Sequence, residues 1–247
     1  MKKVMVMLLA SALFIGGCSQ RTNSSSPAAA TAATPTQENK VEATDRLNDA
    51  ATILNELMNA EDSAISSWVL EKAQCVMVIP SMIKGGFVVG GRHGRGAVTC
   101  RNGGRWSAPA FVTISGGSWG AQIGVESVDL VLLFMNESGV KSLLNNNVKL
   151  GAEASVAAGP VGRQAAAGTD ATMNAQILSY SRTKGLFAGL ELSGAGVRPD
   201  EDSNIAIYGR NINFRTILSG TTPAPAGSEN FLAAVRKNFR EAQVKAP

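Results

Sequence analysis

Apolar side chains recur at helical spacing near both ends of the chain. Residues 47–58 place leucine, alanine and methionine three or four positions apart, directly after a helix cap at Thr44 and Asp45. Residues 63–73 show the same spacing, and so does the stretch from Ser228 to Phe239. The pattern therefore predicts two N-terminal helices and one C-terminal helix.

The middle of the chain has the patterning of short β-strands separated by turns. Residues 75–79 form an apolar run that ends at Pro80, and the nearly all-apolar residues 129–135 are typical of a central strand. Glycine-rich residues 90–96 predict a hairpin turn, and residues 101–104 predict another. Further strands are expected at 110–115, 121–126, 150–158, 163–167, 177–181, 186–192 and 205–208, and a short helix at 136–145. These elements predict an α+β fold, a mostly antiparallel, barrel-like sheet with N-terminal helices and a C-terminal helix.

Residues 1–17 have the pattern of an export signal. Lys2 and Lys3 precede an apolar stretch at 4–15, which is too short to cross a hydrocarbon core of about 30 Å as a helix. Two glycines then precede Cys18, as in a bacterial lipobox, where the cysteine receives a diacylglyceryl group. We expect a lipoprotein signal peptide at 1–17 and lipid attachment at Cys18. The alternative is an ordinary secretory signal with an incidental cysteine.

Residues 18–43 are expected to be the lipidated cysteine and a flexible linker, followed by one domain at 44–247. The linker is rich in serine, alanine, threonine and proline and has few large apolar side chains to bury. Ser19 after the cysteine suggests, by analogy with lipoproteins of this kind, an anchor in the outer membrane facing the periplasm.

The charge and the motifs exclude several classes of function. The formal charge of +4 falls by two once Lys2 and Lys3 leave with the signal, so the composition gives no support for a nucleic-acid partner. The single histidine and the cysteine spacing predict no metal site. Because P-loop and dinucleotide-binding patterns are also missing from the sequence, we expect no cofactor and no nucleotide.

The stretch from Gly116 to Gly120 matches G-x-S-x-G, the nucleophile elbow of α/β-hydrolases. That elbow requires a strand, a sharp turn and a helix, with the histidine later in the chain. Here the following residues alternate as a strand, and His93 precedes the motif in a glycine-rich segment. Without a base Ser118 is not activated, so we interpret the motif as a β-turn and expect no enzyme.

Two cysteines remain once Cys18 is assigned to lipid. An oxidising periplasm permits a disulfide between Cys75 and Cys100. Both residues lie in apolar, strand-like stretches, so the sequence favours two buried free thiols, with the disulfide as the alternative.

The stretches GPVGR at 159–163 and YSRTKGLFAG at 180–189 carry the most specific resemblance in the chain. They are similar to the SYLF domain, a family of lipid-binding modules of bacteria and of eukaryotic endocytic proteins. The likeness covers roughly Asp45 to Ile217. It implies a protein that binds membrane lipids without catalysis.

Arginine and lysine residues occur at many of the predicted turns, where side chains are expected to be exposed. Arginine offers a planar fork for phosphate and lysine a compact charge. Together with the resemblance, this predicts a site for anionic lipid headgroups at Arg182, Lys184, Lys84 and Arg163. In eukaryotic relatives an N-terminal amphipathic helix assists membrane binding, but here residues 47–58 carry an acidic polar face that suits anionic lipid poorly. We therefore expect this helix to pack on the core.

The sequence as a whole predicts an outer-membrane lipoprotein whose domain binds membrane lipids through anionic headgroups. The alternative is a structural envelope or scaffold protein that contacts a protein or the cell wall. In the first case membrane lipids are the partners; in the second the protein partner is unknown.

Overall fold

The computed structural model describes residues 37–59, 65–86, 89–119, 124–160, 174–183, 186–188, 190 and 192–245. Pro35–Pro247 forms one compact unit. The expected signal peptide, Cys18, Arg163, Lys184 and the strand expected near 163–167 lie outside the described residues. In the described part of the chain no helix is both long and apolar enough to cross a membrane.

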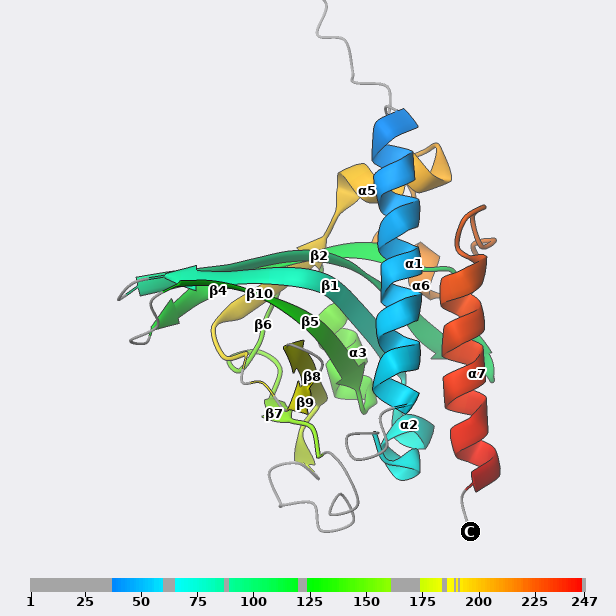
Figure 1. Cartoon of the computed structure of the whole chain (residues 1–247). Helices are drawn as coiled ribbons and strands as arrows, with labels where there is room; N and C mark the ends of the chain where they lie inside the picture. Colours follow the sequence, from blue (N-terminus) through cyan, green and yellow to red (C-terminus); the bar gives the residue numbers. More distant parts are fainter. Residues whose placement is uncertain are drawn as a thin grey trace, which may run out of the picture. The chain divides into compact units, whose positions relative to one another are not determined.

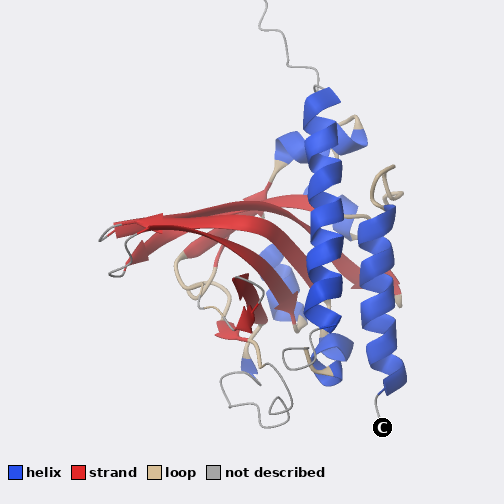
Figure 2. Cartoon of the chain, in the orientation of Figure 1, coloured by secondary structure: helices blue, strands red, loops and turns tan. Residues whose placement is uncertain are grey.

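One large curled sheet dominates the fold and forms a half-barrel (Figures 1 and 2). Its strands follow the order β6-β10-β4-β2-β1-β5-β8-β7, with β3 beside β2 and β9 beside β8. All pairings are antiparallel except that of β7 with β8. The strands are β1 (Cys75–Gly86), β2 (Val89–Asn102), β3 (Arg105–Trp106), β4 (Ala110–Trp119), β5 (Gly124–Phe134), β6 (Val148–Lys149), β7 (Val156–Ala158), β8 (Ile177–Thr183), β9 (Leu186–Ala188) and β10 (Ala195–Pro199). The predicted α+β class is confirmed.

Helices cover both faces of this sheet. They are α1 (Gln37–Asn59), α2 (Ser67–Lys72), α3 (Glu137–Leu143), α5 (Glu201–Tyr208), α6 (Phe214–Leu218) and α7 (Glu229–Lys245). α1 and α7 lie side by side, and with α2 they share one apolar core with the sheet (Figure 1). α3 and α6 contribute to the second core, on the other face.

α1 packs on the core, as its acidic polar face predicted. Leu47, Leu54 and Leu57 are fully buried, whereas Asp45 and Asp49 face solvent. The helix starts at Gln37 rather than near the predicted cap, so it includes the last residues of the expected linker.

Pro80 does not end β1, contrary to the prediction. The register of β1 shifts against both neighbouring strands between residues 78 and 83, and Ser81 has a φ of 48°. A β-bulge leaves residues out of the hydrogen-bond ladder, and a proline without an N–H is tolerated there. β1 therefore continues to Gly86.

The glycine-rich residues 90–96 form part of strand β2, so the predicted hairpin turn at this place is wrong. A Cβ atom on Gly96 would lie 2.1 Å from the carbonyl oxygen of Val78, and one on Gly94 would lie 2.6 Å from a methyl group of Ile79. These glycines allow β2 to pack closely against the bulged part of β1. Glycine in a strand marks close backbone approach as well as turns.

We expect Gly96→Ala to destabilise the domain by about 3 kcal/mol, because the added methyl group meets backbone that cannot move aside cheaply. Gly91→Ala is the matched control, since its Cβ would have no neighbour nearer than 3.9 Å. Its effect should stay within about 0.5 kcal/mol. Urea denaturation measures the free energy of unfolding of each variant. Equal values for Gly96→Ala and Gly91→Ala would contradict the close packing at Gly96.

Other predicted elements are confirmed or corrected. The turn at 101–104, the helix α3, the β8–β9 hairpin and the C-terminal helix α7 are confirmed. The two strands expected at 121–126 and 129–135 are the single strand β5, and only short strands occur within 150–158. The strand expected at 205–208 is the helix α5, because Asp200 accepts from the Ser203 N–H as its N-cap and Gly209, with a φ of 69°, ends it.

Cys75 and Cys100 form a disulfide, so the favoured assignment of two free thiols is wrong. The two residues are direct partners in the β1–β2 register. Their apolar surroundings were identified correctly, since both are buried. The sequence did not reveal that the two strands are antiparallel neighbours with these residues opposite each other.

Candidate functional site

The structure describes two of the four cations predicted to bind headgroups, and it does not bring them together. Lys84 lies opposite Glu126. Glu126 is two positions from Val128 in the same strand, so both point to the face of the sheet whose core includes residues of α3 and α6. Arg182 lies opposite Asp129, on the face that α1 covers. The two described members of the predicted cluster therefore lie on opposite faces of the sheet.

Arg182 is held by carboxylates. Its Nε and Nη2 donate to Asp129 Oδ2 at 3.0 and 2.7 Å, and its Nη1 pairs with Glu56 of α1. Asp129 Oδ1 in turn accepts from the N–H of Ser81 in the β1 bulge. Arg182 therefore joins β8 to β5 and α1, and the two carboxylates more than neutralise its single positive charge.

Lys84 belongs to a row of charges that crosses the central strands. It lies directly opposite Arg92 of β2 on one side and Glu126 of β5 on the other. Like charges placed opposite each other in a sheet repel, and this row carries two cations for one carboxylate. Lys84 forms no ion pair with any described residue. Lys84 is therefore a cation of this row that no ion pair with a described residue neutralises.

Beyond this row the four central strands carry mostly glycine. The next two rows hold glycine and serine apart from Val125, and the pair Val89–Trp119 then ends β2 and β4. The members of the two rows are Gly117, Gly91, Gly85 and Val125, then Ser118, Gly90, Gly86 and Gly124. We call the ends of β1, β2, β4 and β5 from the Lys84 row onward, together with the row of Ile83, the hairpin end. It extends away from α1 and α7, toward the left of Figure 1.

Two apolar side chains are exposed at the hairpin end. Val125 is 79% exposed and Ile83 is 48% exposed, and the third exposed large apolar side chain among the described residues is Val41 on α1. Ile83 pairs with Ser127 and Val125 with Gly85, so Ile83 and Val125 are diagonal neighbours on one face. The hairpin end thus presents apolar side chains on one face and cations on the other.

The two chain segments that connect the strands at the hairpin end carry no charged residue. No charged residue occurs from Gly85 to Gly91 or from Ser115 to Val125. An uncharged end bordered by Lys84 and Arg92 suits a contact with the interface of a membrane, where apolar side chains enter and cations stay at the headgroups.

A second group of charges lies where α1, β2 and α5 meet. Arg95 Nε donates to Asp200 Oδ2 at 2.8 Å, and Arg95 Nη1 to Glu42 at 2.7 Å; Arg46 pairs with the same two acids. Burial alone would raise the pKa of Asp200, but hydrogen bonds from Arg95 and Ser203 outweigh it and hold that pKa below its ordinary value. The buried acid and its two arginines join three elements, which gives this cluster a structural role.

The G-x-S-x-G stretch does not form a nucleophile elbow. Gly116 to Trp119 lie in β4, and the next described element is the strand β5 rather than a helix. The β-turn assigned to these residues is also wrong. His93 lies in β2 opposite Ser115, not in a turn.

Sequence reasoning predicted a headgroup role for Lys84, which stays a prediction, and did not point to the exposure of Ile83 and Val125. An exposed apolar residue looks like any core residue in a sequence, because exposure depends on where a strand leaves the covered part of the sheet. The uncharged stretches around residues 87 and 120 were the available signal.

Comparison with known proteins gives the family. The family model described as Ysc84, Las17-binding protein actin regulator, matches residues 115–238. Protein YSC84 of Saccharomyces cerevisiae is 34% identical over 175 residues, which cover 69% of this chain and 37% of that protein. The human SH3 domain-containing YSC84-like protein 1 is 35% identical over 199 residues, 78% of this chain and 58% of that protein.

The chain thus spans 37% to 58% of the length of these two relatives. LAS seventeen-binding protein 3 of Saccharomyces cerevisiae is similar to the same extent, 36% identical over 170 residues, 67% of this chain and 37% of that protein. The family description and this last name denote binding proteins. These matches show that the chain belongs to the Ysc84 family, the SYLF family that its sequence resembles.

Proposed function

We propose that this protein binds anionic membrane surfaces without catalysis, through the hairpin end, while lipid on Cys18 anchors it to the outer membrane. The observation that carries the proposal is the coincidence, at one end of the sheet, of exposed Ile83 and Val125 with Lys84, a cation that forms no ion pair with a described residue. Apolar contact and attraction to anionic lipid act together in peripheral membrane binding.

The proposal assigns different roles to the four predicted cations. Lys84 contacts headgroups, since it borders the uncharged end and forms no ion pair with a described residue. Arg182 supports the fold through Asp129 and Glu56. Lys184 and Arg163 stay predictions from the resemblance.

A scaffold that binds a protein partner is the second candidate. The family description, a Las17-binding protein and actin regulator, favours it, because it names a protein as the partner of Ysc84. In an envelope protein the partner would be a protein of the envelope or the cell wall.

Flotation with vesicles separates the two candidates. The chain from residue 19 onward, which lacks Cys18, should float with anionic vesicles and much less with neutral ones. Lys84→Glu should lower the partition about tenfold, because one attraction worth roughly 1 kcal/mol is replaced by a repulsion. Arg236→Glu, an exposed cation on α7, is the control and should change little. Binding that is indifferent to lipid charge, or no binding by the folded protein, would favour the scaffold.

A further inference from the structure

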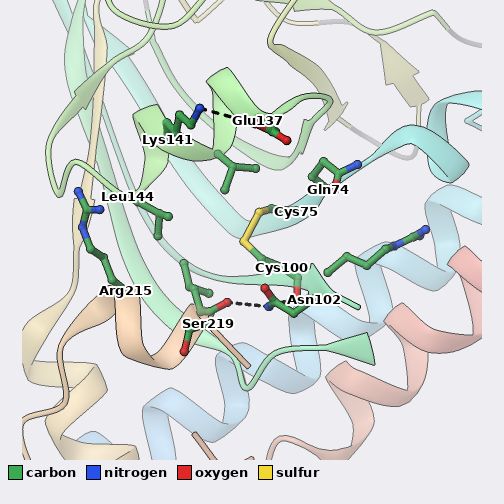
Figure 3. A pocket seen from close by; sticks show the side chains of 12 residues that line it. Gln74, Cys75, Cys100, Asn102, Glu137, Lys141, Leu144, Arg215 and Ser219 are labelled. Carbon is green, nitrogen blue, oxygen red and sulfur yellow. Dashed lines mark hydrogen bonds and ion pairs between the residues drawn. A yellow bond between two sulfur atoms is a disulfide. The ribbon is translucent and has the colours of Figure 1, made fainter. Parts of the chain in front are cut away.

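A pocket of about 480 Å³ opens at the opposite end of β1 from the hairpin end. Its walls are the start of β1, the end of β2, and the helices α3 and α6 (Figure 3). The residues that line it are Gln74, Cys75, Cys100, Arg101, Asn102, Glu137, Val140, Lys141, Leu144, Arg215, Leu218 and Ser219. Its volume is in the range of ligand sites.

Helical spacing explains why the two helices face the pocket. The residues of α3 and its cap that line it are 137, 140, 141 and 144, and those of α6 and its cap are 215, 218 and 219. Side chains three and four positions apart lie on one face of a helix. Each helix therefore turns an apolar residue and a charged residue toward the same space.

The floor of the pocket is apolar. Leu218 is buried, Val140 and Leu144 are half-buried, and the Cys75–Cys100 disulfide lies beside them (Figure 3). A half-buried leucine or valine in a concave site gains free energy when a ligand covers it, at about 25 cal/mol for each Å² of apolar surface removed from water. The floor suits a hydrocarbon chain.

The rim of the pocket carries two cations. Arg215 donates to the side-chain oxygen of Asn145 at 3.2 Å and has no carboxylate partner among the described residues. Lys141 is 3.6 Å from Glu137, but both side chains are largely exposed, and such pairs exchange partners at little cost. The guanidinium of Arg101 is engaged elsewhere, with the carbonyl of Glu71 and the ring of Trp106.

We propose that this pocket binds a single-chain amphiphile with an anionic head, such as a fatty acid or a lysophospholipid. The chain lies on Val140, Leu144 and Leu218, and the carboxylate or phosphate lies between Arg215 and Lys141. Arginine and lysine are the residues that proteins use for these anions. The pocket and the hairpin end lie roughly 35 Å apart along β1, so this binding does not depend on the proposed membrane contact.

Fluorescence titration with cis-parinaric acid, a fluorescent fatty acid, tests the pocket in the chain from residue 19 onward. The wild type should enhance the fluorescence saturably. Leu144→Trp, which fills the floor, should weaken binding at least about tenfold, equivalent to 1.4 kcal/mol. Val140→Trp is a second filling variant if the first lowers the thermal midpoint.

Displacement of the probe tests the rim. Oleate should displace parinarate from the wild type, and the double variant Lys141→Glu/Arg215→Glu should bind oleate about tenfold more weakly while its affinity for oleyl alcohol changes little. Arg236→Glu is the charge control and should leave both affinities unchanged.

Several results would overturn the proposal. These are no saturable binding by the folded wild type, binding that survives both filling variants, and equal losses for oleate and oleyl alcohol. Val125→Glu separates this proposal from the membrane contact, since it should abolish flotation and leave parinarate binding intact. Phosphate alone as competitor distinguishes a site for a free anion, which phosphate would empty, from a site for an amphiphile.

Discussion

Asp200→Asn should destabilise the domain by about 3–5 kcal/mol at neutral pH, the loss typical of removing one partner of a buried ion pair. Asp200 is 8% exposed and is the shared acceptor for Arg95 and Arg46. Its amide would leave Arg46, which is also buried, with the half-exposed Glu42 as the only remaining carboxylate partner among the described residues. The N-cap of α5 should persist, because asparagine caps a helix about as well as aspartate, so the loss reports on the ion pairs. Urea denaturation at pH 7 measures the loss.

The contribution of Asp200 to the free energy of unfolding should depend on pH. Because the folded-state pKa of Asp200 lies below its unfolded value of about 3.9, its contribution is fully present above that value and disappears as the pH falls through the folded pKa. The stability difference between wild type and Asp200→Asn should therefore be large at pH 7 and shrink below about pH 4. Glu201→Gln, an exposed acid of the same helix, is the control and should cost less than about 0.5 kcal/mol at either pH. A constant difference between the two pH values would show that the charge of Asp200 is not what matters.

Removal of the disulfide should cost about 3–4 kcal/mol. The bridge closes a sequence separation of 25 residues, and a loop of that length gives this magnitude in the chain-entropy account. The double variant Cys75→Ala/Cys100→Ala should be less stable than the wild type by this amount. Wild type that is reduced while unfolded and then refolded should lose a comparable free energy of unfolding. Reductant should not change the stability of the double variant.

The alternative of two free thiols makes the opposite prediction. The unfolded protein would then take up two equivalents of iodoacetamide without prior reduction, and its mass would show it. A bridged protein takes up none until it is reduced. Mass spectrometry decides between the two before any stability is measured.

Much of the architecture could be predicted from residue periodicity. The 3.6-residue pattern of α1 and α7 and the apolar run of β5 depend on local sequence, and they survive in the structure. The predictions were wrong where tertiary contacts, rather than local sequence, decide the structural role of a residue. Pro80 lies in a bulge, Gly94 and Gly96 make room for β1, and residues 205–207 are an apolar run within a capped helix.

The candidate site was less accessible from the sequence. Lys84 could be identified as a turn-proximal cation, but its neighbours Arg92 and Glu126 are 8 and 42 residues away in sequence and meet it only through strand register. Exposure of Val125 depends on where the helices stop covering the sheet. The pocket likewise joins two strand ends with two short helices, a combination that no local pattern specifies.

An environment-sensitive fluorophore at Val125 reports whether the hairpin end enters a membrane. The variant Val125→Cys, in the chain from residue 19 onward, carries one free thiol for an NBD label, since Cys75 and Cys100 are bridged. On addition of anionic vesicles its emission should rise and shift to the blue, while the same label at Val41→Cys on α1 should not respond. A response at Val41 with none at Val125 would contradict binding through the hairpin end.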